Sequence, residues 1–340
     1  LAGLGDRFHD HVQKINAILE PMAARLLPTA MHPWMDPHRE AKLWPHEYNA
    51  VYEKFNTIFS CKGHGWSNLQ STHINLPFAN DEEFGRLHAA IRVILALVPA
   101  IAASSPFQEG RATGIADTRL DHYRVNSARI PSMTGLIIPE SVHTRADYEK
   151  TILERIYRDL APHDPEGILR YEWANARGCI ARFDRGAIEI RVVDVQECPR
   201  ADLAIVGVIT HAVRALVEER RSSGDAQRRL ATEPLHEILK RCIAEGEGAM
   251  INYAPLLEVL GLPTAPIAAG GVWAALAERA AEEGAPGGAD AVALTRAGTL
   301  STRMRRAVGE HVDRASLGRV CDDLADCLAR NEMFGMEPAR

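Results

Sequence analysis

The chain lacks several features by which large classes of protein are recognised. Its net charge is −6, and no stripe of lysine or arginine marks a surface for nucleic acid. The longest apolar stretch, 201–217, contains His211 and Arg214, so we expect no segment to cross a bilayer. Neither a glycine-rich phosphate loop nor a dinucleotide-binding glycine fingerprint occurs. These absences argue against nucleic-acid partners, membrane insertion and the two classes of nucleotide-binding protein that carry these glycine motifs.

Cysteine is sparse, and its spacing shows no pattern. Six cysteines occur without a Cys-x-x-Cys pair, and no signal peptide is visible. This usage predicts reduced thiols in a cytoplasmic protein. The composition, with 46% hydrophobic and 25% charged residues, is that of an ordinary globular protein, and 340 residues allow one large domain or two.

Helical spacing of apolar residues dominates the chain. It predicts helices with one buried face and, in the first of them, a kink at Pro21. The predicted helices span 6–27, 45–59, 81–103, 145–160 and nearly everything from 200 onward. The segment 284–288 is predicted to be a flexible loop between helices.

Strand-like alternation occurs in shorter segments. The strands are predicted at 28–34, 70–78, 169–173, 179–183 and 187–194, with a long polar loop over 104–126. This order favours an α+β fold, with an antiparallel sheet and a helical C-terminal region. We expect residues 1–220 to form the catalytic domain and residues 221–340 to form a helical layer of that same domain.

One strand places a histidine on a polar face. In 70–78, Ser71, His73 and Asn75 point to one side, and Ile74 and Leu76 to the other. A neutral imidazole there could bind a metal ion or a phosphate oxygen, and it could equally be a hydrogen-bonded histidine on a sheet surface.

The strand 187–194 carries the clearest charged pair. Glu189 and Arg191 lie two residues apart, about 7 Å along one face of a strand. A carboxylate can hold Mg²⁺ while a guanidinium beside it neutralises a phosphate or carboxylate. Arg177 and Arg182 add positive charge nearby, which favours an anionic ligand. The alternative is an edge strand whose charged face meets water.

The polar loop over 104–126 offers further cations. Arg119 or Arg124, with Tyr123 between them, could hold a substrate carboxylate, because long loops often carry binding residues. A surface loop with incidental arginines is the alternative.

A histidine-rich stretch suggests zinc only weakly. His32, His38 and His46 lie near Asp36, but prolines make this an irregular loop, and no His-Glu-x-x-His helix supports it. A zinc hydrolase built on His32, His38 and His73 therefore remains a minor alternative.

Taken in order, these segments resemble the glutamate–cysteine ligase family, in its bacterial carboxylate–amine ligase and plant-type branch. The resemblance covers about residues 25–215 and rests on four stretches with matching intervals. They are MHPW at 31–34, the strand around His73, SSPFQEGRATGIADTR at 104–119 and AIEIRVVD at 187–194.

The resemblance implies a fold like the catalytic domain of glutamine synthetase. Its antiparallel sheet is bent, with a concave polar active-site face and helices on the outer face. It implies ATP and Mg²⁺ as cofactors and a carboxylate–amine ligase reaction through an acyl phosphate, such as glutamate with cysteine in glutathione biosynthesis. Small-molecule substrates and a homodimer are expected, and the amine acceptor is left open.

Residue roles follow from the matching positions. Glu189 and His73 match metal-binding positions, and His73, Arg191, Arg177 and Arg182 match or neighbour positions at the nucleotide. Arg119 matches the arginine that holds the amino-acid carboxylate, with Tyr123, Arg124 and Asn75 as helpers. Arg191 and Arg119 are the expected catalytic residues.

One departure from the family is expected to matter. Family members begin with strands bearing closely spaced glutamates, and no such strand occurs in the sequence. We expect these strands in an N-terminal segment that the sequence omits. The alternative is a non-catalytic or truncated relative that acts as a binding or partner subunit.

Overall fold

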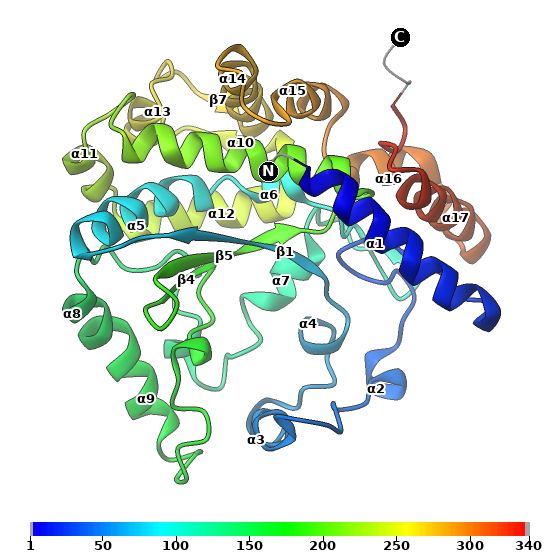
Figure 1. Cartoon of the computed structure of the whole chain (residues 1–340), viewed down its shortest axis with the longest axis horizontal. Helices are drawn as coiled ribbons and strands as arrows, with labels where there is room; N and C mark the ends of the chain where they lie inside the picture. Colours follow the sequence, from blue (N-terminus) through cyan, green and yellow to red (C-terminus); the bar gives the residue numbers. More distant parts are fainter. Residues whose placement is uncertain (1–2, 337–340) are drawn as a thin grey trace.

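The computed structural model describes residues 3–336, and its order of elements is mixed (Figure 1). The strands are β1 (Ser71–Pro77), β2 (Phe107–Gln108), β3 (Arg111–Ala112), β4 (Cys179–Arg182), β5 (Ala187–Asp194), β6 (Met250–Ile251) and β7 (Ile267–Ala268). The helices up to residue 160 are α1 (Leu4–Leu19), α2 (Pro37–Glu40), α3 (Asn49–Phe59), α4 (His64–Ser67), α5 (Asp81–Leu95), α6 (Pro99–Ala102), α7 (Thr118–Tyr123), α8 (Arg145–Tyr148) and α9 (Glu154–Leu160). The later helices are α10 (Pro199–Val217), α11 (Gly224–Arg228), α12 (Thr232–Glu245), α13 (Ala254–Val259), α14 (Ala269–Glu282), α15 (Gly288–Ala297), α16 (Leu300–Val308) and α17 (Arg314–Arg330). The predicted α+β class is confirmed.

A three-stranded antiparallel sheet in the order β1-β5-β4 lies at the centre. β1 and β5 match the predicted strands closely because alternation of apolar and polar side chains sets their period. Gly186, with φ 58°, closes the turn from β4 to β5, a conformation that glycine adopts without strain. The register pairs Glu189 with Asn75 of β1 and with Ile180 of β4.

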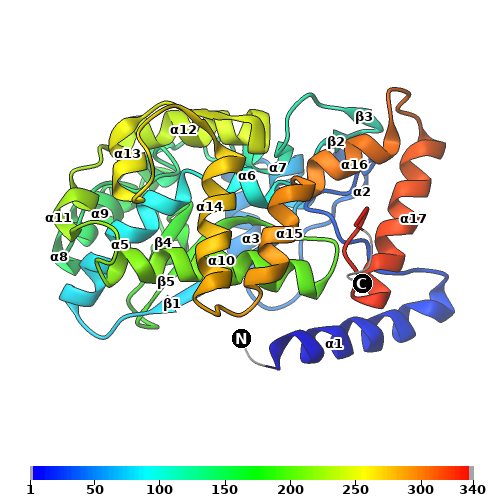
Figure 2. The same cartoon turned by 90° about the horizontal axis from the view of Figure 1, so that it is seen from above.

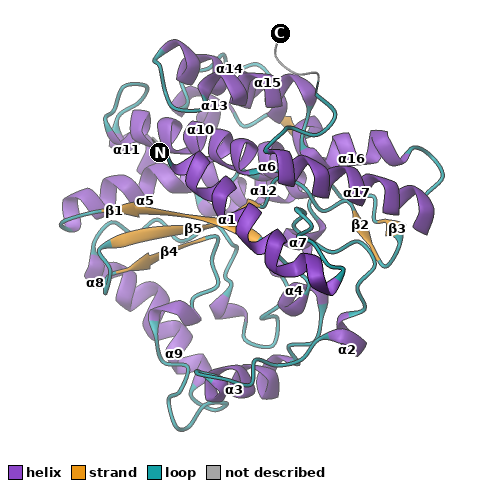
Figure 3. Cartoon of the chain, turned by 45° about the vertical axis from the view of Figure 1, so that its right-hand side comes forward, coloured by secondary structure: helices purple, strands orange, loops and turns teal. Residues whose placement is uncertain are grey.

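The two faces of the sheet differ in character. Ile74, Ile188 and Ile190 are buried and belong to the main hydrophobic core, while His73 and Asn75 are exposed. α5 packs against β4 and β5, and the views agree that α5, α10 and α12 cover one side of the sheet (Figures 1 and 3). The face that carries Glu189 and Arg191 is therefore the side opposite this helical layer.

Several predicted elements were wrong or displaced. The helix predicted over 81–103 breaks after Leu95, because Pro99 cannot donate a backbone hydrogen bond and begins α6 instead. The helix predicted over 45–59 begins only at Asn49. The loop predicted over 104–126 contains the β2–β3 hairpin and α7, whose N-terminus is capped by Asp117.

Two predicted strands are absent from the described residues. In the stretch 28–34, the backbone of His32 forms hydrogen bonds with the side chain of Asn68 and not with a neighbouring strand. The N–H of His32 donates to Oδ1, and its carbonyl accepts from Nδ2. The stretch 169–173 leads into a 3₁₀ turn, after the Asp164 carboxylate accepts hydrogen bonds from the backbone N–H groups of Ile168 and Leu169. Side chains satisfy backbone groups in both places, and local alternation cannot reveal such partners.

The region after residue 200 is helical, as predicted, apart from the short β6–β7 pair. α10, α14 and α15 pack together, and α16 and α17 lie at one end of the molecule beside α1 (Figure 2). The main hydrophobic core contains residues from Ile58 to Met333. Within residues 3–336, no helix combines the length and apolar character needed to cross a membrane.

Candidate active site

The polar face of the sheet gathers several predicted site residues. β5 carries one extra residue opposite His73, since the register advances three residues on β5 against two on β1 between Thr72 and Ile74. Such bulges re-aim side chains and are common beside active sites. We call His73, Asn75, Arg182, Glu189 and Arg191 the polar floor.

Glu189 is the centre of the polar floor. Its Oε1 accepts a hydrogen bond from Arg191 Nε at 2.7 Å and lies 3.2 Å from His73 Nδ1. The side chain is 8% exposed. The hydrogen bond with His73 lowers the pKa of Glu189 to about 2, with Arg191 adding to the effect against the opposing influence of burial. This carboxylate is therefore ionised throughout the neutral range.

Arg191 links the floor to α7. Burial alone would lower the pKa of Arg191, but Tyr123 and Glu189 outweigh it, and the pKa rises above its ordinary value. Its guanidinium also donates to the carbonyl of Asn175 at 3.3 Å. The guanidinium is fixed between the sheet, α7 and the loop that contains Asn175. A cation fixed in this way can contact a bound anion in one defined geometry.

Arg119 lies inside the protein, away from the exposed part of the floor. Its side chain is 2% exposed and pairs with the buried Asp194 at the end of β5. The backbone N–H of Ser104 donates to the other oxygen of Asp194 at 2.8 Å. The Arg119 guanidinium is thus already occupied by a carboxylate of the protein, and its predicted contact with a substrate carboxylate remains a prediction.

Arg177 and Arg182 differ in what they contact. Arg177 is 1% exposed and makes a two-pronged pair with Glu140, at 2.7 and 2.6 Å. Arg182 pairs with Asp184 at 3.1 Å and lies 3.9 Å from Glu189 Oε2. Only Arg182 of the two is part of the polar floor; Arg177 instead ties the segment before β4 to the loop near residue 140.

The remaining predicted residues are near the surface. Asn75 is exposed across from Glu189. Tyr123 is half-buried beside Arg191, whereas Arg124 is exposed and pairs with Asp121 at 2.8 Å. The structure therefore brings Tyr123 to the floor and leaves Arg124 outside it.

Glu172 is a candidate site residue that the sequence patterns did not identify. It lies 3.7 Å from Arg182, and burial together with the neighbouring Asp184 carboxylate raises its pKa to about 7. A carboxyl group that titrates near neutrality is suited to proton transfer. No sequence signal marks it, because its neighbours Arg182 and Asp184 reach it only through the turn that follows β4.

The described residues contain no group of three or more His, Cys, Asp and Glu side chains placed to hold a metal ion. The zinc hydrolase alternative therefore has no geometric support. Among its five residues, the polar floor contains one carboxylate, that of Glu189. Its Oε1 already contacts His73 and Arg191. Mg²⁺ usually keeps several waters and takes one or two carboxylates plus substrate phosphates, so Glu189 fits as one protein ligand of such a site.

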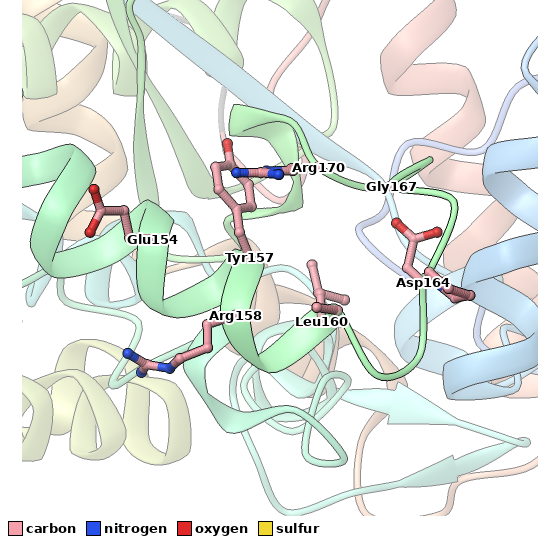
Figure 4. A pocket seen from close by; sticks show the side chains of 9 residues that line it. Glu154, Tyr157, Arg158, Leu160, Asp164, Gly167 and Arg170 are labelled. Carbon is pink, nitrogen blue, oxygen red and sulfur yellow. The ribbon is translucent and has the colours of Figure 1, made fainter.

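A separate cavity of about 380 Å³ lies along α9 (Figure 4). Tyr157, Arg158, Asp164 and Arg170 are among its lining residues, and the Arg170 guanidinium lies over the Tyr157 ring at 5.7 Å. None of its lining residues belongs to the polar floor. We therefore treat the floor and this cavity as different sites.

Comparison with known families identifies the family of the chain. A family model described as Glutamate-cysteine ligase family 2 matches residues 2–240, which include every residue of the floor. The chain belongs to this family. Membership indicates a ligase-type activity, in agreement with the resemblance found in the sequence.

A relative in Archaeoglobus fulgidus is described as an uncharacterized protein. It is 30% identical over 340 residues, which cover 98% of this chain and 83% of the relative. The similarity thus extends beyond the segment matched by the family model and includes the helices after residue 240.

Proposed function

We propose that this member of glutamate–cysteine ligase family 2 is an ATP- and Mg²⁺-dependent carboxylate–amine ligase. It would join the side-chain carboxylate of glutamate to an amine through an acyl phosphate, with cysteine as the first acceptor to test. Family membership supports the reaction class. The observation that carries the proposal is Glu189, kept ionised on a floor that also holds Arg182 and Arg191.

The floor has the charges that this chemistry needs. A carboxylate and a polyphosphate repel each other, so their meeting requires cations at fixed positions. Arg191 and Arg182 would contact phosphate oxygens, and Glu189, oriented by its hydrogen bond with His73, would hold Mg²⁺, which supplies charge neutralisation when it is bound. Asn75 and Tyr123 would contact the amino-acid substrate at the edge of the floor.

Two predicted residues are assigned supporting roles. Arg119 would fix α7 against β5 and so keep Tyr123 beside Arg191. Arg177 would hold the loop before β4 through Glu140. Neither arginine would then need to touch a substrate.

ADP release tests the proposal directly. The full chain is assayed with ATP, Mg²⁺ and glutamate, with and without cysteine. We expect cysteine-dependent turnover that Glu189→Gln lowers by about 10²–10³, the effect of removing a positioned electrostatic group. Glu283→Gln is the matched control, because His211 and Arg220 likewise hold the pKa of Glu283 at about 2, but in the helical layer.

The other outcomes separate the alternatives. Nucleotide binding without turnover would keep the ligase class and point to another amine. If the chain neither binds nucleotide nor turns over, the alternative of a non-catalytic or truncated relative is favoured. Equal loss in Glu189→Gln and Glu283→Gln would contradict a site at the floor.

A further inference from the structure

α2, the β2–β3 hairpin and α17 lie at the same end of the molecule (Figure 2), and residues from these three parts of the chain line a second groove. It has a volume of about 580 Å³, within the range of small-molecule sites. Its lining residues come from three distant parts of the chain and are Trp34, Asp36, His38, Glu109, Gly110 and Arg314. None of them belongs to the polar floor.

One side of this groove presents an available cation. The Arg314 guanidinium lies over the Trp34 ring, 5.0 Å from its centroid. Within residues 3–336 no carboxylate forms a salt bridge with Arg314, although Asp36 and Glu109 line the same groove. An arginine held against an aromatic face keeps its N–H groups free for a carboxylate, which it can bind with two hydrogen bonds.

The groove is also lined by a carboxylate on a strained turn. Glu109 and Gly110 form the two-residue turn between β2 and β3, with φ of 51° and 76°. Glycine, asparagine or aspartate is the usual choice at the first of these positions, so a glutamate there is an exception. The N–H of Gly110 donates to the carbonyl of Pro33 at 2.8 Å and fixes the turn against the His-Pro segment. Strain held in place by the surroundings is characteristic of binding sites.

A hydrogen-bond chain orients the carboxylate of Glu109. The backbone of His32 fixes the Asn68 amide, since its N–H donates to Oδ1 and its carbonyl accepts from Nδ2. Asn68 Nδ2 then faces His64 Nδ1 at 3.1 Å, and because the amide nitrogen only donates, Nδ1 is the acceptor. His64 Nε2 therefore carries the proton and donates to Glu109 at 3.0 Å. This hydrogen bond orients the carboxylate in the groove.

We propose that this groove binds a small zwitterionic amino acid. Arg314 takes the α-carboxylate, and Glu109, helped by Asp36, takes the ammonium group. A groove lined by both a cation and carboxylates matches a ligand whose two opposite charges are attached to one carbon. The proposal does not depend on the ligase activity, because it concerns binding alone.

Calorimetric titration of the full chain with L-alanine and L-glutamine, without ATP, tests the proposal. We expect at least one of them to bind, and Arg314→Gln and Glu109→Gln each to weaken that binding at least about tenfold through loss of a charged contact. Arg319→Gln, on the same helix but outside the groove, and Glu310→Gln should bind as the unchanged protein does. Circular dichroism confirms that each variant is folded.

Analogues that lack one charge complete the test. Propanoate and ethylamine should each bind at least about tenfold more weakly than L-alanine. The proposal fails if neither amino acid binds, or if propanoate binds as tightly as L-alanine. It also fails if Glu189→Gln abolishes binding while Arg314→Gln and Glu109→Gln leave it intact, since the amino acid would then occupy the polar floor.

Discussion

At the scale of single residues, Arg182 lies between two glutamates of very different acidity. Glu189 Oε2 lies 3.9 Å from it and Glu172 Oε2 lies 3.7 Å from it. Glu189 receives direct hydrogen bonds from His73 and Arg191, and its pKa falls to about 2, whereas burial and Asp184 raise the pKa of Glu172 to about 7. Pairs of carboxyl groups separated in this way commonly divide acid–base roles.

The raised pKa of Glu172 predicts a specific dependence of stability on pH. The folded carboxyl group binds its proton more tightly than the unfolded one, whose pKa is about 4.5. Its contribution therefore favours folding below about pH 4.5 and weakens as the pH rises to about 7. We expect the stability of Glu172→Gln, relative to the unchanged protein, to rise across this window in urea unfolding. A difference that stays constant with pH would show that Glu172 titrates normally.

At the scale of elements, the contact between α7 and β5 depends on one buried ion pair. Arg119 and Asp194 are 2% and 0% exposed, and Asp194 also accepts a hydrogen bond from Ser105 Oγ at 3.2 Å. We propose that the pair holds α7 so that Tyr123 stays beside Arg191. Loss of either partner would leave a charge in the interior without compensation.

Arg119→Met should therefore destabilise the protein by about 3–5 kcal/mol in denaturant unfolding. Arg124→Met is the matched control, since Arg124 follows the same helix and makes only an exposed pair with Asp121. It should cost less than about 1 kcal/mol. If both variants are equally stable and Arg119→Met only raises the KM for glutamate, Arg119 holds the substrate instead.

At the scale of the whole molecule, we propose that residues 1–220 and 221–340 fold as one unit. The main core joins side chains from both ranges, among them Leu97 and Trp273. Trp273 is fully buried, and its indole N–H donates to the carbonyl of Leu97 at 2.7 Å. The helices after residue 220 thus pack against α5, α6 and α10, and α5 and α6 in turn contact β5.

We expect one cooperative thermal transition for the full chain. The calorimetric and van't Hoff enthalpies should agree, and Trp273→Ala should lower the midpoint of the whole transition. Unfolding in two steps, with Trp273→Ala shifting only one of them, would show that residues 221–340 form a separate domain.

The sequence by itself determined the local period of most elements and the residues of β1 and β5 that face the polar side of the sheet. Alternation of side chains predicted β1 and β5 and placed His73, Asn75, Glu189 and Arg191 on polar faces, because strand geometry is local. The motifs at 31–34, 104–119 and 187–194 also led to the family that the chain belongs to.

Only the tertiary structure decided which charges meet. Arg119 and Arg177 have the same appearance in the sequence as Arg182 and Arg191, yet they are buried against Asp194 and Glu140. Glu172 reaches Arg182 through a turn that no periodicity marks. The partner of a long charged side chain depends on contacts between distant segments, and these contacts decide whether it faces a ligand or the protein interior.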